Sequence, residues 1–168
     1  MQGVRFVLVC LVASLVACGT SAKHDDATTM PPSAPEAPRV MPKVAISTPT
    51  GEVTVAVEVV ATEAKIQRGL MYRQHLPPDE GMLFLMGGDH ALERDGWPFW
   101  MRNTLIPLDI IWIGKDMTIV EIVENARPRD DTEVGGHVPS RFVLEVNGGY
   151  VAQKKLAKGA RVRFDGVK

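Results

Sequence analysis

A nearly unbroken apolar run at residues 105–113 constrains the fold of this chain more than any other feature. Only Pro107 and Asp109 interrupt it, and the letters GKD at 114–116 end it with a turn signal. Large side chains on both faces of a strand need cover on both faces, so the run predicts a strand that is buried on its two sides. A membrane-spanning helix needs about 20 apolar residues, which this run does not supply. The run therefore marks the centre of a folded core.

Shorter apolar segments around this run predict the other strands of the domain. They lie at 44–48, 53–60, 81–86, 117–123, 141–146 and 160–164. Two short helices are expected among them, one from Glu63 to about residue 69 or 71 and one at 150–156. The turn letters PTG at 49–51 predict that the first two strands form a hairpin. The sequence thus predicts an α+β domain, mainly antiparallel sheet, closed into a small barrel or sandwich with two short helices.

The N-terminus resembles the signal of a bacterial lipoprotein. Arg5 precedes an apolar segment at 6–17, which has the length of a secretory signal core. The segment ends in LVACG at 15–19, similar to a lipobox, in which the signal is cut before a cysteine that then carries diacylglycerol. We therefore expect a signal peptide at 1–17 and a lipid on Cys18, with an ordinary cleavable signal or an N-terminal membrane helix as the alternative.

Lipidation at this point would decide where the protein works and which chemistry it lacks. Residues 18–42 are rich in Pro, Ala and Thr, which predicts a disordered tether ahead of a globular domain at 43–168. Cys10 would leave with the signal and Cys18 would be blocked, so thiol chemistry is not expected. Because Gly19 rather than Asp follows the cysteine, the resemblance implies the periplasmic face of the outer membrane in the bacterial envelope.

Composition and motifs argue against several functions. The formal net charge is -1 at pH 7 and the basic residues are dispersed, so nucleic acid is not an expected partner. The sequence holds no G-x-S-x-G elbow, no H-E-x-x-H zinc motif and no phosphate-binding glycine loop. Met71, Met82, Met86 and Met101 could form a cuprous site, although methionine is more often a core filler. We expect no cofactor and no metal, and the balance is against an enzyme without excluding one.

Asp109 is the most unusual residue of the central run. A carboxylate inside an apolar strand is costly unless it is paired and hydrogen-bonded. Arg68, Arg102 and Arg141 are candidate partners, because a planar guanidinium suits a buried carboxylate. A structural role, as an ion pair or as an acceptor for loop amides, is favoured over a catalytic one.

Aromatic residues just before the run suggest a ligand site. Trp97 and Trp100 lie beside a polar loop, where aromatic faces commonly bind sugars or peptides. Trp100 and Trp112 are expected in the core, and Trp97 is the more exposed one. Asn103 could orient a ligand or bond its own turn. The predicted ligand-binding residues are Trp97, Trp100, Asn103, Asp109, Arg68 and Arg141.

A series of short motifs resembles the DUF192 family, also called UPF0127. They read RGLMYR at 68–73, LP at 76–77, GMLF at 81–84, FWMRNT at 99–104, IPLD at 106–109 and RFVLEV at 141–146. The resemblance implies bacterial and archaeal relatives, often exported, with no agreed biochemical activity. Relatives often carry Pro-Cys before the last motif, where this chain reads ARP at 126–128, so a thiol-based role would not apply here.

These observations predict an exported, lipid-anchored envelope protein that binds a small molecule, a peptide or a protein partner near residues 97–103. One alternative is an envelope hydrolase of carbohydrate or peptide, with Asp109 and Glu145 as paired carboxylates. Another alternative is an envelope assembly factor. Paired carboxylates in one open cleft favour the hydrolase, an exposed tryptophan at a pocket favours the binding protein, and a sealed core with one apolar patch favours the assembly factor.

The lipid anchor can be tested by changing Cys18→Ser. The variant lacks the thiol that would carry diacylglycerol, so we expect it in the soluble fraction, whereas the unchanged chain partitions with membranes. Labelling with radioactive palmitate, followed by fractionation, measures both effects. Recovery of the variant in membranes at the level of the unchanged chain would refute the anchor.

Overall fold

The computed structural model describes residues 40–87 and 96–167, which form a single folded unit. The predicted signal peptide, Cys18 and all but the last three residues of the tether lie outside this part. The described part contains seven strands and two helices. They are β1 (Lys43–Thr48), β2 (Gly51–Val60), α1 (Glu63–Arg68), β3 (Glu80–Leu85), β4 (Leu108–Ile113), β5 (Ile119–Ala126), β6 (Phe142–Asn147), α2 (Tyr150–Lys154) and β7 (Val162–Asp165).

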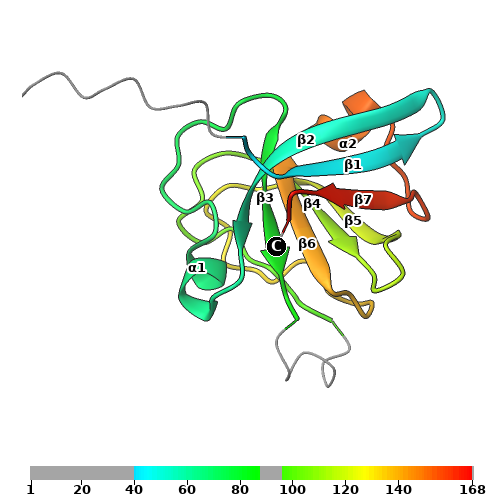
Figure 1. Cartoon of the computed structure of the whole chain (residues 1–168). Helices are drawn as coiled ribbons and strands as arrows, with labels where there is room; N and C mark the ends of the chain where they lie inside the picture. Colours follow the sequence, from blue (N-terminus) through cyan, green and yellow to red (C-terminus); the bar gives the residue numbers. More distant parts are fainter. Residues whose placement is uncertain (1–39, 88–95, 168) are drawn as a thin grey trace, which may run out of the picture. The chain divides into compact units, whose positions relative to one another are not determined.

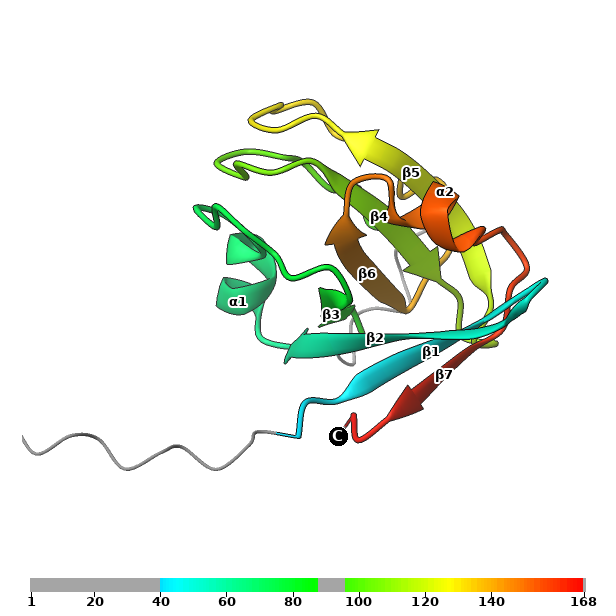
Figure 2. The same cartoon turned by 90° about the horizontal axis from the view of Figure 1, so that it is seen from above.

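The strands form one strongly curled sheet in the order β5-β4-β6-β3-β2-β1-β7. Neighbours are antiparallel except β2 and β3, which run parallel. Figures 1 and 2 show that the sheet bends back on itself as a half-barrel. The two edge strands, β5 and β7, are joined at one corner by backbone hydrogen bonds. The Val162 N–H donates to the Met117 carbonyl at 2.8 Å, and the Ile119 N–H donates to the Ala160 carbonyl at 3.0 Å. The predicted α+β fold with a barrel-like sheet and two short helices is therefore confirmed.

The central run forms strand β4, as predicted, although the strand is shorter than the run. All six residues of β4 are buried, and the strand has β5 on one side and β6 on the other. Leu105, Ile106 and Pro107 stay outside the ladder, because a proline offers no N–H to a strand that is paired along both edges. The Pro107 carbonyl instead accepts the Gly148 N–H at 2.9 Å. In the described ranges, neither helix is long and apolar enough to span a bilayer.

Burial on both faces of β3, β4 and β6 produces two hydrophobic clusters. The first lies inside the half-barrel and includes α2, with Val55, Ile111, Leu144, Val151 and Val162 among its members. The second lies on the opposite face and includes Phe84, Ile110, Trp112 and Val143. The segments that connect the strands cover this second cluster, because they contribute Leu70, Leu76 and Met101 to it.

Trp112 organises the second cluster. Its indole Nε1 donates to the Trp97 carbonyl at 2.8 Å. Gly135, at φ +60, lies so close to the ring that a β-carbon there would collide with it. The Phe99 ring meets the Trp112 ring edge to face, with centroids 6.0 Å apart. One buried tryptophan thus fixes the segment before β4 and the segment before β6.

Asp109 lies on the face that points into the half-barrel. Its carboxylate accepts three backbone N–H groups, from Asn125 at 2.7 Å, Gly149 at 3.0 Å and Val151 at 2.7 Å. The last two belong to the start of α2, which receives no cap from a side chain of its own. The sequence left two structural roles open for Asp109, an ion pair with an arginine or an acceptor for loop amides, and the second is the one observed.

Replacing this carboxylate should destabilise the whole domain. Asp109→Ala leaves three N–H groups without their acceptor in a fully buried site, which costs about 3 kcal/mol or more of the free energy of unfolding. Urea unfolding followed by circular dichroism measures the loss. Glu124→Ala, an exposed change in the neighbouring strand, should shift the same quantity by less than about 0.5 kcal/mol. Equal stability of the two variants would contradict this role for Asp109.

Candidate functional site

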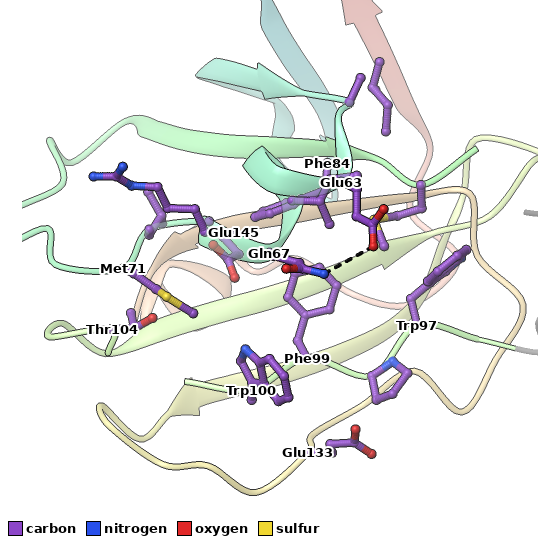
Figure 3. Close-up of a pocket in the computed structure, with 18 residues that line it drawn as sticks. Glu63, Gln67, Met71, Phe84, Trp97, Phe99, Trp100, Thr104, Glu133 and Glu145 are labelled. Atoms are coloured by element: carbon purple, nitrogen blue, oxygen red, sulfur yellow. Dashed lines mark hydrogen bonds between the residues drawn. The ribbon is translucent and has the colours of Figure 1, made fainter. Parts of the chain in front are cut away.

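A pocket of about 640 Å³ lies over the second cluster, between α1 and the segment that leads into β4. Helix α1 and the turn after it supply Ile66, Gln67 and Met71 to the lining. The opposite side comes from residues 97–100, and β3 and β6 supply Phe84 and Glu145. In the view of Figure 3, Glu145, Met71 and Thr104 gather at one end of the pocket and Trp97 lies at the other.

The aromatic wall of the pocket is fixed by the sheet beneath it. Phe84 is fully buried on β3 and meets the Phe99 ring edge to face, with centroids 5.1 Å apart. The backbone of Phe99 forms a two-way bridge with Val134, at 3.0 Å and 2.7 Å. Trp100 is 40% exposed, and the Arg102 guanidinium carbon lies 4.5 Å from the centroid of its ring. The wall therefore combines a rigid inner part with one accessible indole.

Glu145 is the polar group deepest in this site. Strand β6 places it opposite Met82 on one side and Ile110 on the other, so its side chain shares their face of the sheet. The residue is only 5% exposed, and its Oε2 has no hydrogen-bond partner among the described residues. Figure 3 shows its carboxyl group directed into the pocket. A buried polar atom without a partner is unusual in a folded protein and calls for an explanation.

The surroundings of Glu145 favour its neutral form. Burial raises the pKa of Glu145 to about 8, and the positive charge of Arg73 opposes this shift only in part. Arg73 itself forms an ion pair with Glu58, which lies outside the pocket lining. At neutral pH the side chain is therefore mostly a carboxylic acid, which can both donate and accept a hydrogen bond.

The rim of the pocket carries more negative than positive charge. Glu63 and Glu133 are exposed there, and Arg68 is the one basic residue among the described residues of the lining. The Gln67 amide donates to Glu63 at 3.3 Å, as the dashed line in Figure 3 marks. Gly69, at φ +46, keeps the inner end open, because a β-carbon there would lie 3.4 Å from the Phe84 ring and 3.8 Å from Glu145 Oε2. An open, acidic entrance thus leads to a buried acid.

Three of the six predicted ligand-binding residues line this pocket, namely Trp97, Trp100 and Arg68. Asn103 does not; it occupies a turn at φ +56, where its carbonyl accepts the Tyr72 N–H at 2.9 Å. Arg141 does not either, because its guanidinium packs against Gly87. The structure also differs from the prediction for Trp100, which is exposed rather than part of the core, whereas Trp97 is half-buried.

Asp109 lies on the other face of the sheet. In the β4–β6 ladder it stands opposite Val146, while Glu145 stands opposite Ile110, and such adjacent positions point to opposite faces. Asp109 therefore lies outside this pocket, and it does not share a cleft with Glu145. Of these two acids, only Glu145 belongs to the pocket. The sequence carried a signal for its position, because Val143 and Glu145 are two residues apart in an apolar strand and so share one face.

Metal ligands do not gather in the described ranges. No group of three or more His, Cys, Asp or Glu side chains there could hold a metal ion. Of the four methionines considered for copper, Met82, Met86 and Met101 belong to the second hydrophobic cluster, and Met71 is half-buried at the pocket. Core packing accounts for the first three.

Comparisons with known proteins give a family but no activity. The family model DUF192, described as an uncharacterized ACR, matches residues 45–164. A solved protein of unknown function from Novosphingobium aromaticivorans is 38% identical, with a TM-score of 0.66 over 72% of this chain and 83% of its own. A Sinorhizobium meliloti protein, described as a candidate transcription regulator, is 35% identical, with a TM-score of 0.68 over 75% and 95%. No curated protein matches this chain.

The raised pKa of Glu145 makes the stability of the domain depend on pH. An unfolded glutamate loses its proton near the ordinary value of 4.5, whereas the folded one keeps it to about 8. The stabilisation is therefore complete at low pH and declines as the pH rises, by up to about 1.4 kcal/mol per pH unit between roughly 5 and 8. Urea unfolding at several pH values measures this decline.

The isosteric change Glu145→Gln removes the titrating group and should remove this part of the decline. Glu124→Gln, an exposed change outside the pocket, should leave it in place. Parallel curves for the unchanged chain and Glu145→Gln over this pH range would show that Glu145 titrates normally in the folded state.

Proposed function

This chain belongs to the DUF192 family, a family described as uncharacterized, and we propose that this member is a binding protein without catalysis of its own. It holds a small molecule or the side chain of a peptide in the pocket between α1 and residues 97–100. The observation that carries this proposal is the Glu145 carboxyl group, buried at the inner end of an aromatic pocket with no hydrogen-bond partner for Oε2 among the described residues. Ligand sites commonly have this form, with apolar walls and a few convergent polar groups.

The size and composition of the pocket support a small ligand. A volume of about 640 Å³ falls in the range of small-molecule sites, roughly 300–1,000 Å³. Phe99 supplies apolar surface and packs on the buried Phe84 ring, and Trp100 supplies an exposed ring. A ligand that reaches Glu145 would satisfy a polar atom that otherwise costs folding free energy. Burial of Glu145 without a hydrogen-bond partner therefore favours binding of a ligand that offers one.

The proposed place of action is the bacterial envelope. The lipobox-like letters LVACG at 15–19 support a lipid anchor on Cys18 and the periplasmic face of the outer membrane. The Pro-rich residues that follow would then hold the domain away from the lipid surface, at a distance on the order of 25 Å for a flexible chain of that length. In this proposal the lipid on Cys18 binds the membrane, and the pocket binds the ligand.

Two other functions have less support. A hydrolase with Asp109 and Glu145 as partners lacks its geometry, since the two carboxyl groups face opposite sides of the sheet. An assembly factor that uses one apolar surface patch has little to offer, because the large exposed apolar side chains of the described ranges are Val40, Tyr72 and Trp100. Transcription regulation, the description of one relative, would need a basic face for DNA, whereas this chain has a net charge of -1.

Tryptophan fluorescence can detect a ligand, because Trp97 and Trp100 line the pocket while Trp112 lies beneath it. We expect a saturable change in the emission of the purified full chain with at least one member of a panel of peptidoglycan-derived sugars, short peptides and small amines. Trp100→Ala should weaken the ligand about tenfold, the scale of one lost aromatic contact in a binding site.

Tyr72→Ala is the matched control for this experiment. Tyr72 is also an exposed aromatic residue, at 61%, and it lies outside the pocket lining. Its removal should leave the affinity unchanged. A panel without any saturable member, or equal losses in the two variants, would refute binding in this pocket.

A further inference from the structure

We infer that the ligand of this pocket carries an organic ammonium group, which sits against the aromatic wall and pairs with the Glu145 carboxylate. This inference rests on the proposed function, because it names the chemical class of the ligand that the same pocket takes. Three independent features of the site support it: its charge, its ring surfaces and its unpartnered acid.

The charge of the lining selects against anions. Among the residues that the structure describes, its acidic members are Glu63, Glu133 and Glu145, and its single basic member is Arg68. Arg68 is exposed at the rim, whereas Glu145 is 5% exposed at the inner end. An anion that entered would meet two glutamates and one arginine at the mouth and a carboxyl group at the end. A cation would be attracted along the same path.

The ring surfaces of the wall suit a cation that water hydrates weakly. Trp97, Phe99 and Trp100 line the pocket with at least part of each side chain exposed, and the faces of such rings attract cations. The Arg102 guanidinium, 4.5 Å from the Trp100 centroid, already uses one of these rings in this way. Alkylammonium groups combine positive charge with an apolar surface, so they match a wall of this kind better than Ca²⁺ or Mg²⁺, which need several oxygen ligands.

The unpartnered acid supplies the counter-charge. Without a ligand, burial holds Glu145 mostly neutral at pH 7, since its pKa is raised to about 8. A cation beside it favours the ionised form, so the pKa falls and the proton leaves to solvent. Arg73, after α1, is the charge that acts on this group, and Glu63, Arg68 and Glu133 are the other charged residues of the described lining. Cation binding is therefore coupled to release of one proton from one named residue.

This coupling gives the ligand class a distinct signature. At pH 7 about 0.9 protons leave for each cation bound, if the free acid titrates near 8. The affinity for the cation rises up to about tenfold per pH unit below pH 8 and levels off above it. A neutral ligand of the same shape leaves the proton in place, and its affinity stays constant over this range.

Choline and its uncharged carbon isostere 3,3-dimethylbutan-1-ol are a matched pair of probes for this test. Calorimetric titration of the purified full chain in phosphate buffer, at fixed ionic strength and pH 7, gives the affinity. The same titration in a weakly buffered solution with the indicator phenol red, which contains no amine, gives the protons released. We expect choline, and tetramethylammonium chloride as a smaller probe, to bind at least about tenfold more tightly than the isostere. Repeating the titration at pH 6 and 8 gives the pH dependence.

Two variants assign the effect to Glu145. Glu145→Gln keeps the shape of the acid but cannot ionise, so it should lose the preference for choline, the proton release and the pH dependence together. Glu124→Gln removes an exposed carboxylate outside the pocket and should retain all three. Retention of proton release in Glu145→Gln would overturn the assignment even if choline binds.

The remaining outcomes separate this inference from the proposed function. Equal affinities for choline and its isostere, or no binding of either cation while a sugar or peptide of the fluorescence panel binds, would overturn the ammonium ligand and leave the binding role intact. Absence of any saturable binding would overturn both. Choline binding with proton release that depends on Glu145 would establish both.

Discussion

The carboxyl group of Asp109 joins two separate pieces of backbone, through three N–H groups, to the centre of the sheet. It accepts N–H groups from Asn125 near the end of β5, from Gly149 before α2 and from Val151 within α2. Because β4 is buried on both faces, this acid can stay in the core only while all three donors surround it. The position of α2, and with it the inner wall of the half-barrel, follows from one side chain.

The second buried acid of the domain stands in physical contrast to the first. Glu145 occupies the neighbouring strand and points to the other face, where rings and methionine side chains replace backbone donors. The same carboxyl chemistry therefore has two outcomes, a group that holds backbone donors for structure and a mostly neutral group with an unused oxygen. The two acids occupy adjacent positions of the β4–β6 ladder and so point to opposite faces of the sheet. The pocket can therefore contain an unsatisfied carboxyl group without disturbing the hydrogen bonds at the start of α2.

The sequence predicted the elements well and the site only in part. Apolar runs and turn letters located all seven strands and both helices, since period and turn chemistry are local properties. The parallel pairing of β2 with β3 was not predicted, because it depends on how residues 61–79 cross the sheet. Asp109 was identified as unusual from its apolar neighbours, but its donors come from residues 16, 40 and 42 positions away. The exposure of Trp100 was not predicted, because it depends on the path of the segment before β4. The spacing of apolar residues in the sequence does not determine that path.

The pairing of β1 with β7 also constrains the order in which the domain can be completed. Lys43 stands opposite Asp165, so the first strand of the domain finds its outer neighbour only when nearly the whole chain is available. During synthesis β1 can form its hairpin with β2 early, while its other edge keeps unpaired N–H and carbonyl groups. Such an edge pairs readily with other chains. Strand β7, which is short and charged, covers it only after it has been synthesised. Loss of β7 would thus expose the edge of β1, a strand from the other end of the folded domain, to pairing with other chains.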